Sequence, residues 1–225
     1  MRHSVLWVLW LFPALVQAAG PLPPPHDDKT LDFSLRMARA KSEFRYDTAT
    51  ADTTIKWLGL SVREKVSPRL ELGMFGGYAY VTQTRNPLTA GMELDGYHAG
   101  FSLHAVLLAT PQATLYGVLD YTYQKVEHKS DVQTVVIDWS EPHAQLGGIV
   151  PLAKRWRLFG GSNYGYIDGE ERASGTTNHT VGFKRAARAG GFLGLDLQTD
   201  IDGYVGLEAR SGLARGVEMY FKRRY

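Results

Sequence analysis

The stretch of residues 115–123 reads LYGVLDYTY and alternates strictly between two kinds of side chain. One parity carries Leu115, Gly117, Leu119, Tyr121 and Tyr123, and the other carries Tyr116, Val118, Asp120 and Thr122. A period of two is typical of a β-strand, in which successive side chains point to opposite faces. The stretch therefore predicts a strand with one apolar face and one mixed face.

A pair of tyrosines separated by one residue closes this stretch, and similar pairs close two others. The pairs are Tyr78 and Tyr80, Tyr121 and Tyr123, and Tyr164 and Tyr166. The first tyrosines of successive pairs lie 43 residues apart, which indicates a recurring structural unit. We interpret this unit as one hairpin with its two connections.

The same alternation recurs through the rest of the chain, with short polar turns alternating with longer polar stretches. Strands are expected over residues 32–45, 54–66, 69–84, 94–109, 113–127, 133–152, 155–169, 181–198, 202–211 and 214–225. Long loops are expected at residues 46–53, 82–96, 125–133, 168–180 and 209–216. The pattern predicts an all-β, antiparallel, up-and-down barrel of about ten strands, or eight if two segments extend outside a membrane.

Composition excludes several classes of site. The 225 residues include no cysteine, so disulfides, thiolate metal sites and cysteine nucleophiles are ruled out. A net charge of +2 gives no electrostatic case for nucleic acid as a partner.

The first residues carry the pattern of a secretory signal. Arg2 precedes an apolar run from Val5 to Val16, and Ala18 supplies a small residue for cleavage. The alternative, a retained helical anchor, would need a longer apolar run. We expect a signal peptide at residues 1–18, a proline-rich periplasmic linker at 19–30 and the barrel at 31–225.

Charged residues of the strands fall on the less apolar parity. They are Arg36, Glu71, Asp120, Arg157, Arg188, Asp196 and Glu218. In a membrane barrel such charges occupy the lumen, while the apolar parity meets lipid. The tyrosine pairs all lie at the same end of their strands, just before the longer stretches, where a membrane interface favours aromatic rings. These features predict a transmembrane barrel with a charged lumen and a tyrosine girdle.

The last ten residues, GVEMYFKRRY, alternate Val217, Met219, Phe221, Arg223 and Tyr225. Here the chain resembles the outer-membrane β-barrel proteins of Gram-negative bacteria, in particular the small OmpA-like and OmpX-like group. In that family a terminal aromatic residue with apolar residues at alternate upstream positions is read by the barrel-assembly machinery. Val217, Met219, Phe221 and Tyr225 match this signal, and Arg223 departs from it. The resemblance implies an outer-membrane location, contact with outer-membrane lipid and two periplasmic termini.

Two arrangements would favour an enzyme. Glu141 and His143 share a parity, and an acid beside a histidine at a barrel rim resembles the omptin proteases; the second pair, Asp95 and His98, has opposite parity. A lipid-modifying hydrolase could instead use a serine and a histidine on one inward face, as Ser102 and His104 would be.

A shared metal ion is not expected. His98 and His104 lie on one face but about 20 Å apart at about 3.3 Å per residue. We predict no catalytic residue, cofactor or metal.

The interpretation we favour is a barrel whose lumen is plugged by charged side chains, with a structural or surface-interaction role through its long loops. Such roles include envelope integrity, adhesion and binding of an external ligand. A narrow small-solute pore is the first alternative. An outer-membrane enzyme and a soluble periplasmic ligand-binding barrel follow.

Overall fold

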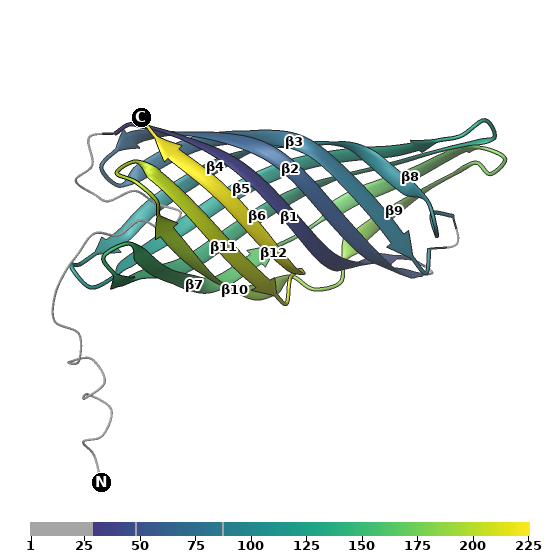
Figure 1. Ribbon diagram of the computed structural model, residues 1–225. Helices are drawn as coiled ribbons and strands as arrows, with labels where there is room; N and C mark the ends of the chain where they lie inside the picture. The colour runs from purple at the N-terminus through teal and green to yellow at the C-terminus, as the bar shows by residue number, and fades with distance from the viewer. Residues whose placement is uncertain (1–28, 48, 87) are drawn as a thin grey trace, which may run out of the picture.

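The computed structural model describes residues 29–47, 49–86 and 88–225. Within them one antiparallel sheet rolls into a long barrel whose strands are tilted relative to its axis (Figure 1). The expected signal peptide and residues 19–28 of the expected linker lie outside the described residues. Among the described residues, no helix long and apolar enough to cross a membrane is found.

Twelve strands form in the part of the chain that the structure describes. They are β1 (Leu31–Tyr46), β2 (Thr50–Ser67), β3 (Leu70–Thr84), β4 (Glu93–Ala109), β5 (Thr114–Lys129), β6 (Gln133–Ala153), β7 (Trp156–Gly165), β8 (Asp168–Gly175), β9 (His179–Arg185), β10 (Ala189–Gln198), β11 (Gly203–Ser211) and β12 (Arg215–Arg224).

The strand pairings close two rings that share β1 to β6. Near the chain ends, the described strands run β1 to β7, then β10, β11 and β12, and β12 pairs with β1, which makes ten. Farther along the barrel, β8 and β9 take the place of β7, β10, β11 and β12. There β9 pairs directly with β1 through Phe44↔Arg185, so this ring of the described chain has eight strands. Ten strands were predicted, and the ring at the chain ends has that number.

The expected long loops are mostly strand. Between β5 and β6 only residues 130–132 remain, and between β8 and β9 only 176–178. Of the expected loops, only the one between β3 and β4 is long, at residues 85–92. The prediction of long loops is wrong because polar outward residues were read as loop, although apolar residues continue to alternate with them on the inner face.

The outer surface of the ten-stranded ring is apolar. Its exposed side chains include Phe33, Leu35, Leu58, Leu60, Met74, Phe101, Leu119, Leu146, Leu193, Leu207, Val217 and Phe221. Charged and polar residues on the same strands are buried inside. This distribution is the reverse of that in a soluble barrel and is the one that a bilayer requires.

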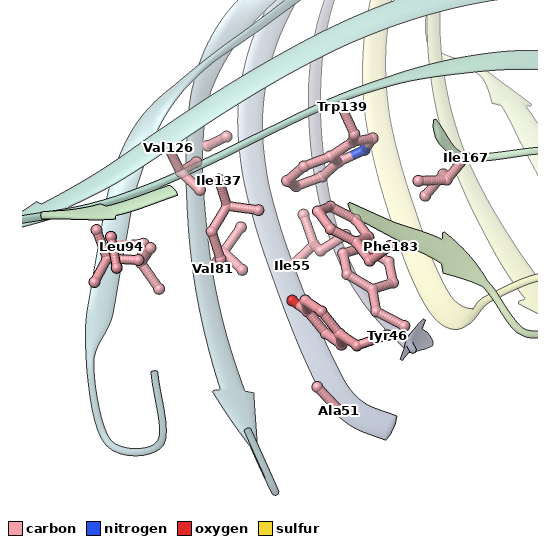
Figure 2. Packing of buried hydrophobic residues seen from close by; sticks show 14 residues of the cluster. Tyr46, Ala51, Ile55, Val81, Leu94, Val126, Ile137, Trp139, Ile167 and Phe183 are labelled. Atoms are coloured by element: carbon pink, nitrogen blue, oxygen red, sulfur yellow. The ribbon is translucent and has the colours of Figure 1, made fainter. Parts of the chain in front are cut away.

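The eight-stranded ring has the opposite distribution. Its interior holds an apolar cluster that includes Trp139 and Phe183 (Figure 2). Phe44 stacks on Phe183 at 4.8 Å between ring centroids and meets Trp139 edge-on at 5.5 Å. Glu43 and Arg45, which alternate with Phe44, are exposed on the outside. An apolar interior with a charged exterior suits water, so this ring lies beyond the lipid.

Inward aromatic rings lie over inward glycines of the neighbouring strand. The pairs are Phe75 and Gly100, Tyr116 and Gly147, Phe159 and Gly194, Phe183 and Gly169, and Tyr220 and Gly206. A Cβ atom at Gly206 would lie 2.0 Å from Cζ of Tyr220. Glycine therefore lets a large ring lie against the wall of a narrow lumen.

Both ends of the described chain lie at the barrel end that carries the turns at residues 68–69, 110–113, 154–155 and 199–202. The amide of Thr30 donates a hydrogen bond to the carbonyl oxygen of Tyr225 at 3.1 Å. In the turn between β10 and β11, the amide of Asp202 donates to the carboxylate of Asp200 at 2.9 Å. Together with the amide of Gly203, this bond lowers the pKa of Asp200.

Candidate functional site

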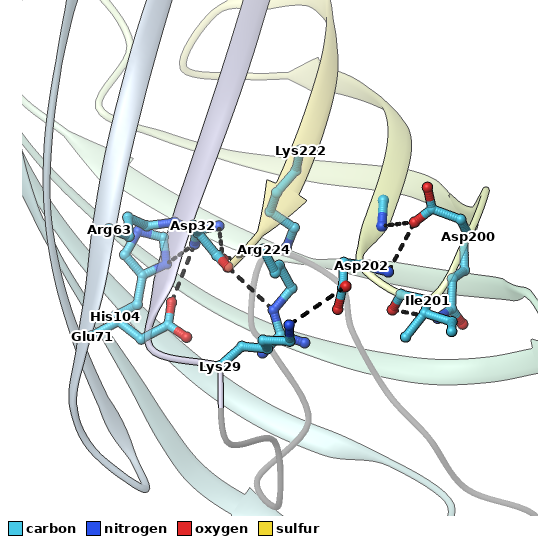
Figure 3. A network of polar contacts seen from close by, with 12 residues as sticks. Lys29, Asp32, Arg63, Glu71, His104, Asp200, Ile201, Asp202, Lys222 and Arg224 are labelled. Carbon is cyan, nitrogen blue, oxygen red and sulfur yellow. Dashed lines mark hydrogen bonds and ion pairs between the residues drawn. The ribbon is translucent and has the colours of Figure 1, made fainter.

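The lumen is filled by layers of paired charges, and the first layer lies at the turn end (Figure 3). Asp32 is its centre. Its carboxylate lies 3.2 Å from Nη2 of Arg63, 3.2 Å from Nε of Arg224 and 3.9 Å from Nζ of Lys222. Nη1 of Arg63 also lies 3.5 Å from the Glu71 carboxylate. All five side chains are buried, so each charge depends on the others for compensation.

A second group of charges lies beside this layer. Nη2 of Arg157 donates to Asp196 at 2.8 Å, and the hydroxyl of Tyr220 donates to the other carboxylate oxygen. The Arg157 guanidinium lies over the ring of Tyr204, 4.6 Å from its centroid. Lys222 also approaches this ring, at 5.1 Å, and so links the two groups.

The middle layer is built on Glu218. Its carboxylate accepts hydrogen bonds from Nε of Arg36 at 2.7 Å and from Nη2 of Arg210 at 3.0 Å. Arg210 also pairs with Glu208. Two guanidinium groups and two carboxylates thus neutralise one another across β1, β11 and β12.

Next to this layer is an internal cavity of about 160 Å³. On its wall, Nδ1 of His143 lies 3.2 Å from the carboxylate of Asp120, and Arg185 holds Glu141 with two hydrogen bonds of 2.7 and 3.1 Å.

Three buried side chains of this wall, His98, Gln124 and Asn163, each have one polar atom with no hydrogen-bond partner among the described residues. The cavity has room for several waters that could satisfy these atoms.

The outermost layer lies inside the eight-stranded ring, against the apolar cluster. Glu171 is fully buried there and accepts hydrogen bonds from the Tyr46 hydroxyl and from Nδ2 of Asn86, both at 2.9 Å. Burial and the Glu171 carboxylate raise the pKa of the Tyr46 phenol. Gln83 completes the network through bonds to Tyr46, Asn86 and Thr89.

Six of the seven lumen charges predicted from the sequence point inward: Arg36, Glu71, Asp120, Arg157, Asp196 and Glu218. The prediction for Arg188 is wrong. Arg188 is exposed in the segment between β9 and β10, and its guanidinium lies 5.9 Å from the centroid of the Tyr166 ring on the outside. The strand is interrupted at residues 186–188, so the parity of the segment does not carry through.

Other inward charges were missed, although parity could have identified several of them. They include Asp32, Arg63, Glu171, Arg185, Glu208, Arg210, Lys222 and Arg224. Lys222 and Arg224 share the parity of Glu218, so alternation along the last strand places them in the lumen as well.

The six tyrosines predicted as a girdle lie on the outer face. They are Tyr78, Tyr80, Tyr121, Tyr123, Tyr164 and Tyr166, and the first tyrosine of each pair is about half exposed. Tyr78 pairs with Leu58 on the apolar band, whereas Tyr80 pairs with Lys56, so this tyrosine pair straddles the change from apolar to charged outer surface. Their assignment as a membrane girdle stays a prediction.

Of the three residue pairs considered for an enzyme, two lie inside the lumen, and the third has its members on opposite faces of the barrel wall. Ser102 and His104 both point inward, but Nδ1 of His104 lies 3.3 Å from Nη1 of Arg63. His143 contacts Asp120, whereas Glu141 contacts Arg185. Asp95 is exposed outside while His98 is buried inside.

Among the described residues, no group of three or more potential metal ligands is found.

The predicted assembly signal lies on the outer face of β12 and just beyond it. Val217, Phe221 and Tyr225 are exposed and Met219 is partly so, and Arg223 shares this face. The same strand closes the ten-stranded ring by pairing with β1 from Arg224 to Arg215.

Comparison with solved structures identifies the architecture. The outer-membrane protease OmpT from Escherichia coli superposes with a TM-score of 0.53 at 13% identity, covering 89% of this chain and 98% of its own. The β domain of the Bordetella autotransporter BrkA gives a TM-score of 0.52 at 14% identity, covering 88% and 99%. The chain has the fold of an outer-membrane β-barrel protein. No protein-family model matches the sequence, and no curated protein matches it.

Proposed function

We propose that this protein is a closed barrel of the outer membrane with a structural or surface-interaction role. The observation that carries the proposal is the apolar cluster inside the eight-stranded ring, in which Phe44 and Ile137 are fully buried and Trp139 is 2% exposed. A path for polar solutes through the barrel would have to cross this cluster. Dehydrating a solute against apolar walls is unfavourable, so the cluster seals the lumen.

The charged layers reinforce this closure. Each inward cation of the middle layer pairs with a carboxylate. This layer therefore offers an ion no row of unpaired charges along which to pass. A narrow small-solute pore is the second candidate, since cavities of about 160 and 70 Å³ lie in the lumen. It would require the aromatic cluster to rearrange.

The two ends of the barrel support a proposed orientation. In the family that the chain resembles, both termini face the periplasm, and here both ends of the described chain lie together at the end opposite the eight-stranded ring. The eight-stranded ring would then project from the cell surface. Its charged outer wall and hairpin tips, in place of long loops, would contact an external ligand or neighbouring envelope components.

Insertion would depend on the last strand. Val217, Met219, Phe221 and Tyr225 present an apolar and aromatic row outward, where the barrel-assembly machinery could read it. We propose no catalytic role, because Glu141 and His143 contact other side chains inside a closed lumen, Arg185 and Asp120 respectively.

Conductance in planar lipid bilayers tests the closure. The purified wild-type barrel is expected to be silent, whereas the double variant Trp139→Ala and Phe183→Ala, which removes the centre of the apolar cluster, should show discrete conductance steps. Leu119→Ala and Leu207→Ala remove two exposed apolar side chains from the outer wall and serve as the control. Steady conductance by the wild-type barrel would support the pore and contradict the closed lumen.

A further inference from the structure

Four basic side chains form a compact cluster on the outer wall of the barrel, across β12, β1 and β2. Arg39 lies directly opposite Lys56 on β2, and Lys41 lies directly opposite Arg215 on β12. All four are exposed. Residues directly opposite in an antiparallel pair have Cβ atoms about 5 Å apart, and like charges in such positions repel.

Nothing in the described part of the chain neutralises this cluster. None of the four has a carboxylate within ion-pair distance there, and the contact recorded for Lys56 is with the ring of Tyr80, 5.1 Å from its centroid. Acids on the same outer face lie at the edges of the cluster: Glu43, two residues beyond Lys41, Asp52, which is paired with Arg85, and Asp95, opposite Tyr80 on β4. Two opposed like-charge pairs in one patch indicate an anionic partner from outside the chain.

The depth of the cluster identifies the kind of anion. One row nearer the turns, the outward residues on the same strands are Met37, Leu58 and Met219, which belong to the apolar band. Arg39 and Lys56 are therefore the first outward charges past this band, beside Tyr80. Anionic headgroups lie at this depth in a bilayer, and arginine and lysine are the side chains that bind phosphate.

The wall beside the cluster is hollowed. The β11–β12 hairpin ends at residues 212–214, where the ten-stranded ring gives way to the eight-stranded one. A hollow of about 710 Å³ lies there, and Lys41, Arg215, Glu43 and Leu213 are among its lining residues. A bulky headgroup could enter this hollow while its acyl chains follow the apolar band.

We propose that Arg39, Lys41, Lys56 and Arg215 bind the phosphate groups of a lipid in the outer leaflet. The proposal rests on the placement of the eight-stranded ring outside the membrane, as set out under the proposed function. It does not depend on whether the lumen is closed. Binding of the phosphates removes the repulsion between the opposed cations and fixes the junction of the two rings.

Thermal unfolding of the full mature barrel in detergent micelles tests the proposal, with the gel shift between folded and unfolded forms as the readout. The probes are lipid A with both phosphates, the same lipid with both phosphates removed, and inorganic phosphate. The phosphorylated lipid should raise the unfolding temperature by about 5 to 10 °C at roughly a hundredfold excess over its dissociation constant. The other two probes should leave it unchanged.

Two double variants locate the effect. Arg39→Gln with Lys56→Gln, and Lys41→Gln with Arg215→Gln, should each lose most of the shift while unfolding at or above the wild-type temperature without lipid. The higher temperature would reflect the removal of repulsion. Lys125→Gln with Lys129→Gln removes two outward cations from β5, away from the cluster, and should keep the full shift.

An equal shift in all three double variants would overturn the proposal. An equal shift with the dephosphorylated lipid would show that acyl chains suffice, and one with inorganic phosphate would show a free-anion site; each contradicts a lipid phosphate site. Conductance is an independent readout, so a conducting barrel that keeps the lipid effect would refute the closed lumen alone.

Discussion

At the scale of single residues, the lumen is a set of charges that stabilise one another. Asp32 compensates Arg63 and Arg224, and Glu218 compensates Arg36 and Arg210. Removing one member of such a group leaves a buried charge without a partner, which costs more than the pair contributes. The interior charges are therefore coupled, and the central carboxylates should be the most sensitive positions.

Glu218→Gln tests this coupling. The substitution keeps the size of the side chain and removes the negative charge that holds two guanidinium groups, so the free energy of unfolding should fall by about 3 to 5 kcal/mol. Urea titration of the barrel refolded in lipid vesicles measures the change. Glu64→Gln, at an exposed outward position of β2, should change it by less than about 0.5 kcal/mol. Equal effects would show that the lumen charges are independently solvated.

The glycines opposite aromatic rings give a second test at this scale. Gly206→Ala places a methyl group against the Tyr220 ring and should destabilise the barrel by about 1 to 3 kcal/mol in the same titration. Gly182→Ala, on the outer face of β9, meets no atom closer than 3.8 Å and should be neutral or slightly stabilising. If alanine at position 182 lowered the free energy of unfolding as much as alanine at position 206, then backbone flexibility and not packing against a ring would explain why glycine occupies these positions.

At the scale of elements, strand length separates the two parts of the barrel. A membrane strand needs about 9 to 11 residues. β7, β10, β11 and β12 have 10, 10, 9 and 10 residues, whereas β2 has 18 and β6 has 21. The short strands therefore end at the boundary of the lipid, and the long ones continue beyond it and form part of the eight-stranded ring.

The sequence predicted which segments form strands better than it predicted the residues at which the strands begin and end. The strand expected at residues 94–109 is β4, Glu93–Ala109, because alternation of apolar and polar residues runs through its whole length. Residues 168–180, which include β8 and the start of β9, were expected as loop because most of them are polar. A local pattern does not show that Ala173 meets Val135 and Ile137 in one interior. Closure of β9 onto β1 depends on contacts between distant segments, which a local pattern does not contain.

The candidate site was predictable to a similar degree. Parity placed Asp120 and Glu218 in the lumen correctly, because the residues on either side of each in the sequence are apolar or aromatic. It did not show which charges meet, since the pairing of Arg36 with Glu218 joins the first strand to the last. Arg188 was misplaced because the break between β9 and β10 has no signal stronger than a run of small residues.

At the scale of the whole molecule, closure leaves no open sheet edge among the described strands of the ten-stranded ring, because β12 pairs with β1. Such a barrel resists unfolding until heated. Protein extracted from outer membranes in mild detergent should therefore migrate differently on a gel when unheated than when boiled. Recovery in the soluble periplasmic fraction with no shift would contradict the membrane barrel and favour a soluble one.

The most direct test of the central claim, an apolar outer wall in lipid that gives way to a water-exposed ring outside the cell, is cysteine labelling along β1. The chain has no cysteine, so single substitutions can be read without background. In intact cells, a membrane-impermeant maleimide should label Glu43→Cys and Arg45→Cys but not Leu35→Cys, Phe44→Cys or, in the turn at the other end, Asp200→Cys. Labelling of Phe44→Cys in preference to its neighbours, or of Asp200→Cys in place of Arg45→Cys, would contradict the sealed ring or its orientation.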